Sequence, residues 1–398
     1  MASRASPGRC ARRPASSRGP DANERSRWAR GWSRCPLKSL RPLERGDLEQ
    51  VAALFLRVVR PGAGDAVAET AAYFERTTLD HPWADPDIPS LVFVDDRGTI
   101  TGFIGSYVTR MRLDGDSVRA ACPGNLVADP EARAVAPGAL LLREHFNGAQ
   151  DVTFVDTLGE PSRAMWEALG GDTAWLGAVS WVRVFRPLRL AYARFVHPRR
   201  LRAPNFVLSP VFASLDGAAR TFWPSLLRPS TPPTTARPLD PKVMAAELPR
   251  LTAGMRLYPD YDEPYLAWLL AELATPRRRG RLVGRLVCDG ERVLGWYVYF
   301  QKPGGISRVL QIMGSERDIG AVVDHLFHDA ETGGTAALEG RIEPRLLAPL
   351  ARRRCILRHT AAAGIHSKND EILAAAFSRR SVFTRMDSEY WPIPPRRL

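Results

Sequence analysis

The stretch Glu131 to Ala139, EARAVAPGA, decides how this sequence is interpreted. It lies between a short apolar run, NLVADP, and a segment with helical spacing, LLREHF. An Arg followed by small residues at a strand-to-helix junction is typical of a phosphate-binding loop, because the free N–H groups of a helix N-terminus attract anions. An ordinary surface turn is the alternative interpretation. The sequence on either side of the loop is needed to decide between a phosphate-binding loop and a turn.

The segments on either side predict an alternation of strands and helices. The helix after residue 45 has apolar residues at helical spacing, Val51, Leu54 and Phe55 among them. Further segments follow the same rules of periodicity and turn residues. The expected order is strand and helix (38–59), helix (65–80), hairpin (90–113), strand (117–130), helix (136–147), strand (152–157), helix (160–171) and an extended region (174–188).

Three short echoes between the two halves predict a duplicated domain. LRPL at 40–43 recurs as ARPL at 236–239, and the strand-turn-strand pattern from Asp96 recurs from Asp289. A Glu-Pro pair opens a helix at Glu160 and again at Glu343. Because the echoes keep their order, we expect a basic, disordered head and two domains joined by a linker that ends in a Pro/Thr-rich run. The predicted ranges are 1–36 (head), 37–188 (first domain), 189–233 (linker) and 234–398 (second domain).

The net charge of +13 suggests a nucleic-acid partner, but its distribution argues against one. Residues 1–36 hold nine arginines, no lysine and only two acids, Asp21 and Glu24, so a large part of the excess lies in this head. The head has no apolar core region and therefore does not fit a secretory signal. A disordered tail, an upstream extension and an organelle transit peptide stay open as interpretations.

Cysteine and histidine usage indicates neither disulfides nor a metal. The five cysteines are scattered and form no C-x-x-C pair, and the seven histidines show no H-x-x-x-H spacing. A reducing cytoplasm is the expected location. No apolar run approaches the length that spans a bilayer. A membrane-surface role for the aromatic and basic segment 211–227 stays a secondary alternative.

With its element order and its loop, the chain resembles the GNAT acyltransferase superfamily. The central loop of that family reads Gln/Arg-x-x-Gly-x-Gly/Ala; here Arg133 and Gly138 match, while Ala136 stands where the first Gly is expected. The resemblance covers about residues 38–188 directly and 234–398 through the repeat. It implies an α/β (α+β) fold of two GNAT-like domains, each with a mixed, mostly antiparallel sheet flanked by helices.

The resemblance also implies acyl-coenzyme A, acetyl-CoA above all, as the group donor. Backbone N–H groups around the end of the fourth strand would polarise the thioester carbonyl, and the loop would hold the pyrophosphate. Pro137 lacks an N–H and removes one donor from that loop. The expected contacts are Leu126, Val127 and Ala128 for the carbonyl and Arg133, Ala134, Val135, Ala136, Gly138 and Ala139 for the phosphates.

The attacking amine needs a general base, for which Asp156 and Glu160 are the candidates and His145 a third choice. Each also has a purely structural interpretation. Asp156 would be a strand-end residue, Glu160 an acid in the first turn of a helix, and His145 a solvated helix residue. Trp166 stands where many family members carry a Tyr that protonates the thiolate, and an indole N–H cannot serve as an acid. Cys122 raises the idea of a covalent acyl-enzyme, but a small buried residue is the favoured interpretation.

The second half has MGSERDIGAVV in place of the loop, and the acids Glu316 and Asp318 would repel phosphate. We expect a degenerate domain that completes the acceptor cleft or stabilises the first half. The tandem resembles mycothiol synthase and, more distantly, the Fem-type aminoacyl transferases. The predicted function is N-acyl transfer from acyl-CoA to a small-molecule or peptide amine by direct attack. A non-catalytic GNAT-like binding or scaffold protein and a Fem-like aminoacyl transferase remain as alternatives.

Overall fold

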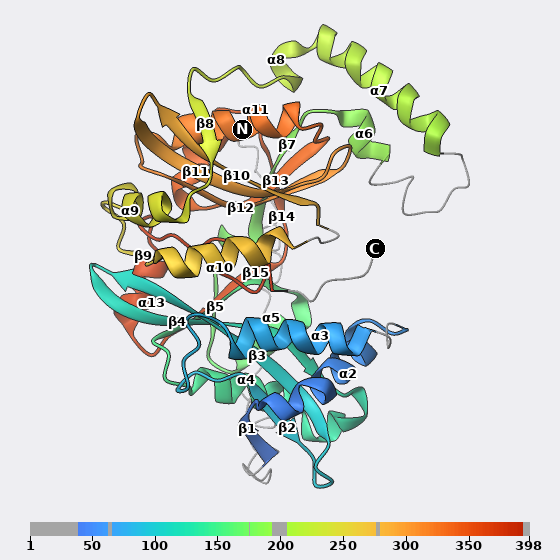
Figure 1. Ribbon diagram of the computed structural model, residues 1–398, viewed down its shortest axis with the longest axis vertical. Helices are drawn as coiled ribbons and strands as arrows, with labels where there is room; N and C mark the ends of the chain where they lie inside the picture. Colours follow the sequence, from blue (N-terminus) through green and yellow to red (C-terminus); the bar gives the residue numbers. More distant parts are fainter. Residues whose placement is uncertain (1–38, 63–65, 175, 193–204, 276–278, 393–398) are drawn as a thin grey trace, which may run out of the picture. The chain divides into compact units, whose positions relative to one another are not determined.

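A computed structural model describes residues 39–62, 66–174, 176–192, 205–275 and 279–392. The predicted head, residues 1–36, lies outside this part of the chain. From Ser39 onward the chain clusters as one unit built on two sheets. The expected order of strands and helices is confirmed, with β-α-α-β-β-β-α-β-α-β in the first half (Figure 1).

The first sheet, sheet A, is built mainly from the first half of the chain. The helix predicted after residue 45 is α2, and it buries Val51, Leu54 and Phe55 against the sheet. The helices of this half are α2 (Leu48–Val59), α3 (Val67–Phe74), α4 (Pro137–Phe146) and α5 (Glu160–Ala168). In spatial order the strands are β1 (Leu40–Pro42), β2 (Leu91–Val94), β3 (Ile100–Leu113), β4 (Asp116–Ala128), β5 (Val152–Leu158), β15 (Ala362–His366) and β6 (Asp172–Ala174), with β9 (Leu257–Pro259) paired to β3.

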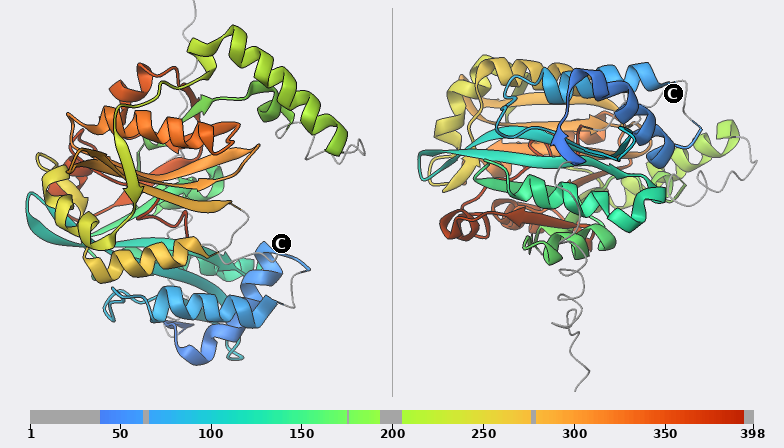
Figure 2. Two further views of the ribbon diagram at one scale, coloured as in Figure 1. Left: turned by 45° about the horizontal axis from the view of Figure 1, so that its top comes forward. Right: turned by 90° about the horizontal axis from the view of Figure 1, so that it is seen from below.

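The second sheet, sheet B, repeats this plan. Helices α9 and α10 cover one face and α11 covers the other (Figure 2). The helices of this half are α9 (Pro241–Leu251), α10 (Glu263–Ala274), α11 (Ile319–Thr332), α12 (Leu347–Ala351) and α13 (Asp370–Ala376). In spatial order the strands are β14 (Ile356–His359), β7 (Val179–Val184), β13 (Ala337–Arg341), β12 (Ile306–Gly314), β11 (Arg292–Gln301), β10 (Arg281–Asp289) and β8 (Thr235–Pro238).

The three echoes fall at equivalent places in the two sheets. The LRPL and ARPL copies form the edge strands β1 and β8, and the strand-turn-strand copies form β2–β3 and β10–β11. Glu160 begins α5, and Glu343 precedes the short 3-10 turn that leads into α12. The prediction of a duplicated fold is therefore confirmed.

Sheet B contains one strand from the first half of the chain, and sheet A contains two from the second half, β15 and the short β9. Strand β7, coloured green in Figure 1, lies between β13 and β14 of sheet B, and β15, coloured red, lies between β5 and β6 of sheet A. Trp181 of β7 is fully buried in the core beneath α11, and its indole N–H donates to the Arg341 carbonyl at 3.1 Å. Ile365 of β15 packs with Phe154 in sheet A. The sheets thus do not follow the ranges 37–188 and 234–398 strictly.

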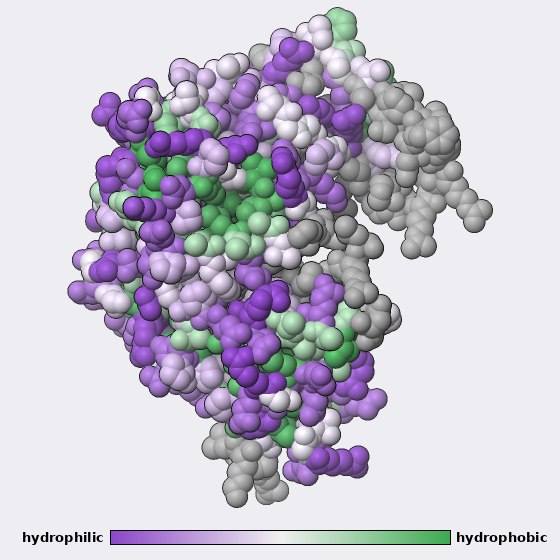
Figure 3. All heavy atoms as spheres, viewed as in Figure 1, coloured by the Kyte–Doolittle hydropathy of each residue, from purple (hydrophilic) through white to green (hydrophobic). Residues whose placement is uncertain are grey.

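The segment predicted as a linker, 189–233, is largely helical where the structure describes it. It holds α7 (Asn205–Phe222) and α8 (Pro224–Leu227), after α6 (Pro187–Ala191), whose first N–H groups donate to the buried Asp216. On the face seen in Figure 3, apolar side chains gather over sheet B in the upper half of the view.

Candidate acyl-transfer site

Strands β4 and β5 run side by side at one end and then part. Their parallel pairing is limited to Ala120 with Val152 and Ala121 with Thr153. Beyond these pairs, a cavity of ≈ 170 Å³ opens between the strands and helices α4 and α5. We call this cavity the β4–β5 opening. It is lined by Ile104, Pro123, Gly124, Asn125, Leu126, Leu142, Val155, Thr157, Leu158, Ser162, Met165, Trp166 and Glu389.

The opening arises from an irregularity in β4. The pairing of β3 with β4 shifts register between Phe103 and Gly105, and Asn125 has a φ of 52°. A residue in this left-handed conformation bends a strand, and Asn tolerates it better than most residues do. The Asn125 side chain fixes the bend because its amide donates to the Tyr107 hydroxyl and, at 2.7 Å, to the Pro392 carbonyl.

The loop EARAVAPGA connects this bent strand to α4. Residues Pro130–Val135 form a 3-10 turn, and Ala136 follows with φ 49° and ψ 53°. This left-handed conformation suits Gly far better than Ala, which explains why the related pattern carries Gly there. Gly138 lies in the first turn of α4, and a Cβ placed on it would meet only the Ala128 Cβ at 3.8 Å. The helix N-terminus is therefore open to an approaching group.

The N–H groups of this turn are partly used. The N–H groups of Ala139 and Leu140 both donate to the Ala136 carbonyl, and Pro137 has none. The loop is anchored at its start by Asp129, which accepts the Glu131 N–H and an ion pair from Arg57 at 2.5 Å. The site offers fewer donors than a loop without Pro, but its entrance is free.

The predicted carbonyl-polarising residues lie on different faces of β4. Leu126 lines the opening, whereas the Val127 side chain is buried among the residues of α2 and α3 on the other face. Ala128 ends the strand opposite Gly102. For Arg133 and Ala134 only the backbone is described; Val135 is exposed, and Ala139 is partly buried beside Gly138.

A carboxylate that the sequence analysis did not select, Glu389, closes the inner end of the opening. Its Oε2 accepts the Asp156 N–H at 2.8 Å and the Cys122 thiol at 3.3 Å, while its own N–H donates to the Cys122 sulfur at 2.9 Å. Its Oε1 is buried and has no hydrogen-bond partner among the described residues. Burial and the neighbouring charge of Asp156 raise the pKa of Glu389.

Asp156, the first predicted base, is held in a buried ion pair. Its carboxylate receives Arg341 at 2.9 Å and Arg385 at 3.3 Å, and all three side chains are almost fully buried. Both oxygens of this carboxylate are thus engaged by guanidinium groups in charge-assisted pairs. Asp156 therefore fits a positioning role, since its N–H holds Glu389.

Glu160, the second predicted base, lies on the surface of α5. Its side chain is 79% exposed and pairs with Arg163 at 2.5 Å. His145 is buried on the inner side of α4, and burial, assisted by His366, lowers its pKa to about 4. The structure thus brings neither side chain to the lining of the opening.

Trp166 lines the opening and Cys122 contacts Glu389 behind it, and the polar groups of both are in use. The Trp166 indole N–H donates to the Asp172 carbonyl at 3.2 Å, and its ring meets Phe146 edge-on. Burial and the charge of Glu389 raise the pKa of the Cys122 thiol, so that it stays protonated and unsuited to nucleophilic attack.

The equivalent place in sheet B is filled. Strands β12 and β13 also pair in parallel only at one end, from Ile306 with Ala337 to Arg308 with Glu339. Past this point a space of only ≈ 10 Å³ remains. Gln311 occupies it: its amide donates to the Tyr261 hydroxyl at 2.8 Å and to Thr384 at 3.1 Å, and its carbonyl accepts the Trp296 indole at 2.7 Å.

The turn before α11 also differs from the loop of the first half. Only residues 315–318 separate β12 from α11, and the Asp318 carboxylate accepts the Ser315 hydroxyl at 2.9 Å. A carboxylate at the helix N-terminus takes the place that an anionic ligand would favour.

Within the described residues, no cluster of His, Cys, Asp or Glu could hold a metal ion. The same residues include no helix of the length and hydropathy that crossing a membrane requires.

Solved structures with this fold carry the same general description. A GCN5-related N-acetyltransferase from Anabaena variabilis superposes with a TM-score of 0.55 at 11% identity, over 84% of this chain and 74% of that one. A probable N-acyltransferase from Enterococcus faecalis superposes with a TM-score of 0.52 at 8% identity, over 82% and 71%. No family model and no curated protein matches the sequence. The protein therefore has the fold of the GCN5-related N-acetyltransferases, in two copies.

The sequence held one signal for the residue that was missed. The segment SEYWPIPP places an acid, Glu389, among aromatic residues and prolines near the C-terminal end. An acid inside a segment that buries Trp391 needs a polar partner or a function. That its partners would be Cys122 and Asp156 depends on the tertiary fold.

Proposed function

We propose that the first half transfers an acyl group from acyl-coenzyme A to a primary amine. The observation that carries this proposal is the β4–β5 opening, which ends at a buried carboxylate and is lined in part by α4, the helix whose first turn leaves space at Gly138. In sheet B the same two places hold the Gln311 network and Asp318.

Acyl-coenzyme A fits the residues around the opening. The apolar side chains of Ile104, Leu142 and Met165 suit the pantetheine arm. The loop and first turn of α4, residues 133–139, are proposed to hold the pyrophosphate. The N–H groups of Leu126, Val127 and Ala128 are proposed to stabilise negative charge on the carbonyl oxygen. The bound molecule supplies an activated acyl group.

Glu389 is the proposed proton acceptor. As the amine nitrogen bonds to the acyl carbon and the C–S bond breaks, one proton moves from nitrogen to Glu389 Oε1, the oxygen without a partner. The sulfur leaves as a thiolate, which a pKa of about 8.5 for a free thiol makes tolerable without a protonating residue. Trp166, with its N–H committed to Asp172, is then not required as an acid. Asp156 and Glu160, the candidates from sequence, are not needed as bases.

Binding of acetyl-CoA tests the proposal directly. Calorimetry on the whole chain should detect binding, and Gly138→Trp should weaken it by at least about tenfold, or about 1.4 kcal/mol, because the indole fills the space at the helix N-terminus. Gly217→Trp on α7, where a Cβ also meets open space, is the matched control and should leave the affinity unchanged. A wild-type protein that binds no acetyl-CoA at millimolar concentration contradicts the proposal.

Turnover separates an enzyme from a binding protein of the same fold. Ala136 and Trp166 depart from the active pattern of the superfamily, so binding without thiol release on addition of primary amines supports the non-catalytic alternative. Release of free thiol that depends on amine supports the enzyme.

A further inference from the structure

A second cavity lies on the other side of β5. It has a volume of ≈ 140 Å³ and is lined by both halves of the chain. Because successive side chains of a strand point to opposite faces, Phe154 and Asp156 face this cavity, whereas Thr157 faces the β4–β5 opening. Val155 lines both. The two cavities therefore meet across a single strand.

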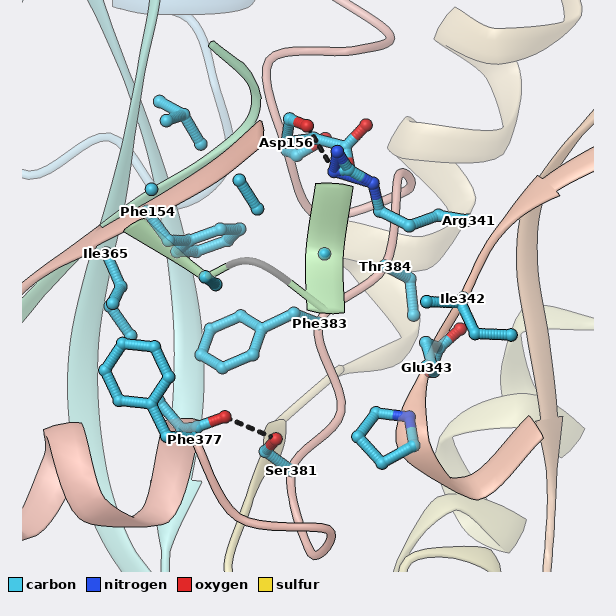
Figure 4. A pocket seen from close by; sticks show the side chains of 18 of the residues that line it. Phe154, Asp156, Arg341, Ile342, Glu343, Ile365, Phe377, Ser381, Phe383 and Thr384 are labelled. Carbon is cyan, nitrogen blue, oxygen red and sulfur yellow. Dashed lines mark hydrogen bonds and ion pairs between the residues drawn. The ribbon is translucent and has the colours of Figure 1, made fainter. Parts of the chain in front are cut away.

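One wall of this second cavity is apolar and rich in phenylalanine. Figure 4 shows the rings of Phe154, Phe377 and Phe383 gathered on one side, together with Ile365. The rings of Phe154 and Phe383 are in contact, with centroids 5.0 Å apart. Three elements of different origin supply these rings: strand β5, the end of α13, and the segment that leads to Glu389.

The opposite wall is polar and charged. Figure 4 shows the Asp156–Arg341 pair at one end and Glu343 with Thr384 across from the rings. Glu343 is buried and pairs with Arg345 at 2.7 Å, and burial raises its pKa. The cavity thus has one apolar wall, and across from it a wall whose carboxylates are held in ion pairs.

The second cavity ends one residue short of the proposed proton acceptor. Ser388 lines it, and the next residue, Glu389, lines the β4–β5 opening. The Asp156 N–H, on a residue of the second cavity, donates to Glu389. For direct attack, a molecule held here must extend its amino group past Val155, which lines both cavities, to Glu389 Oε1 and the acyl carbon in the opening.

We infer that the second cavity is the acceptor subsite and that it takes a small primary amine bearing one aromatic ring. This inference rests on the proposed acyl transfer. The ring packs against Phe154, Phe377 and Phe383, and the amino group points toward Glu389. The size agrees, because an apolar cavity of about 150 Å³ lined by Leu, Ile and Phe accommodates benzene. A sugar or a polyamine would leave the phenylalanine wall without contacts.

A panel of amines tests the inference with the whole chain and acetyl-CoA. We expect kcat/KM for 2-phenylethylamine to exceed that for ethylamine by about 10- to 100-fold, since burial of a ring in an apolar pocket gives discrimination of that size. Glucosamine and putrescine should be no better than ethylamine. Ala174→Phe, which fills the cavity from β6, should abolish the preference, and the exposed Ala218→Phe on α7 should keep it.

Direct binding keeps this test separate from that of the proposed function. Saturation-transfer NMR should show 2-phenylethylamine bound to the wild type and to Ala218→Phe but not to Ala174→Phe. If Ala174→Phe unfolds, Phe377→Ala replaces it: Phe377 is 51% exposed, and its loss should weaken the preference without loss of fold. Equal rates for all four amines overturn the inference while acyl transfer stands. Absence of 2-phenylethylamine binding overturns it whether or not acetyl-CoA binds.

Discussion

The β4–β5 opening and its counterpart between β12 and β13 have the same strand arrangement but differ in the space between the strands. In both, two parallel strands pair briefly and then part. The first leaves a cavity of ≈ 170 Å³ lined in part by α4, whereas the second leaves ≈ 10 Å³ and has Asp318 at the N-terminus of α11. The fold alone therefore does not make a site. The two places differ in the side chain that lies between the strands. In the first half it is Glu389, which has one oxygen without a partner among the described residues, and in the second half it is Gln311, whose amide groups are all hydrogen-bonded.

The largest expected effect concerns whether the first half can keep its opening alone. A fragment of residues 39–191 lacks β15, so β5 loses its neighbour and Phe154 its contact with Ile365. We expect this fragment to show no cooperative thermal unfolding. A fragment of residues 39–398 is the control and should unfold cooperatively. A folded short fragment would mean that the strand exchange is dispensable for the first sheet.

The next effect tests the ion pair that joins the opening to the second half. Asp156→Ala leaves Arg341 and Arg385 buried without this carboxylate, and we expect a loss of about 3–5 kcal/mol in the free energy of unfolding. Asp114→Ala removes an exposed pair with Arg256 and should cost much less than Asp156→Ala. Urea denaturation measures both. Equal losses in the free energy of unfolding would show that the buried ion pair stabilises the protein no more than the exposed one.

Glu389→Gln removes the proposed proton acceptor but keeps its shape. We expect kcat to fall by about 10²- to 10⁴-fold with unchanged acetyl-CoA affinity, whereas Glu160→Gln should leave kcat as it is. The base must be deprotonated to act, and the pKa of Glu389 is raised. Activity should therefore rise with pH through a value above that of an ordinary Glu. That limb should be missing in Glu389→Gln, and a wild-type profile flat down to pH 4 would contradict the role.

A smaller effect is expected at the left-handed Ala136. Replacing it by Gly removes a conformational cost, so that stability should change little or rise by up to about 1 kcal/mol. Ala139→Gly, one turn further into α4, should instead cost up to about 1 kcal/mol. Differential scanning calorimetry distinguishes the two. A destabilising Ala136→Gly would show that the loop does not hold its left-handed conformation in solution.

The smallest effect is expected in the second half. Reversing Glu316 and Asp318 to Lys gives the α11 N-terminus a charge that suits phosphate, but the filled gap behind it cannot admit a pantetheine arm. Turnover and acetyl-CoA affinity should stay nearly unchanged by steady-state kinetics and calorimetry. A large loss of acetyl-CoA affinity would show that the second half, and not the first, binds the cofactor.

The sequence was sufficient for the element order, the duplication and the position of the loop, because each depends on local spacing. It was not sufficient for the strand exchange: the alternation in VSWVRV predicts a strand, but not the sheet that the strand joins. The proposed base, Glu389, was missed for a related reason. Glu389 accepts a hydrogen bond from Asp156, which is 233 residues away in the sequence. Local periodicity cannot predict a contact over that separation.

The exchange of β7 and β15 has a consequence for synthesis on the ribosome. Sheet A is incomplete until residues 362–366 emerge, and its opening lacks a carboxylate until Glu389 follows. The first half, although translated first, cannot finish folding first. If Glu389 is the proton acceptor, as proposed, nascent chains have no activity before it emerges, and a premature stop after residue 366 would leave sheet A nearly complete but without this carboxylate.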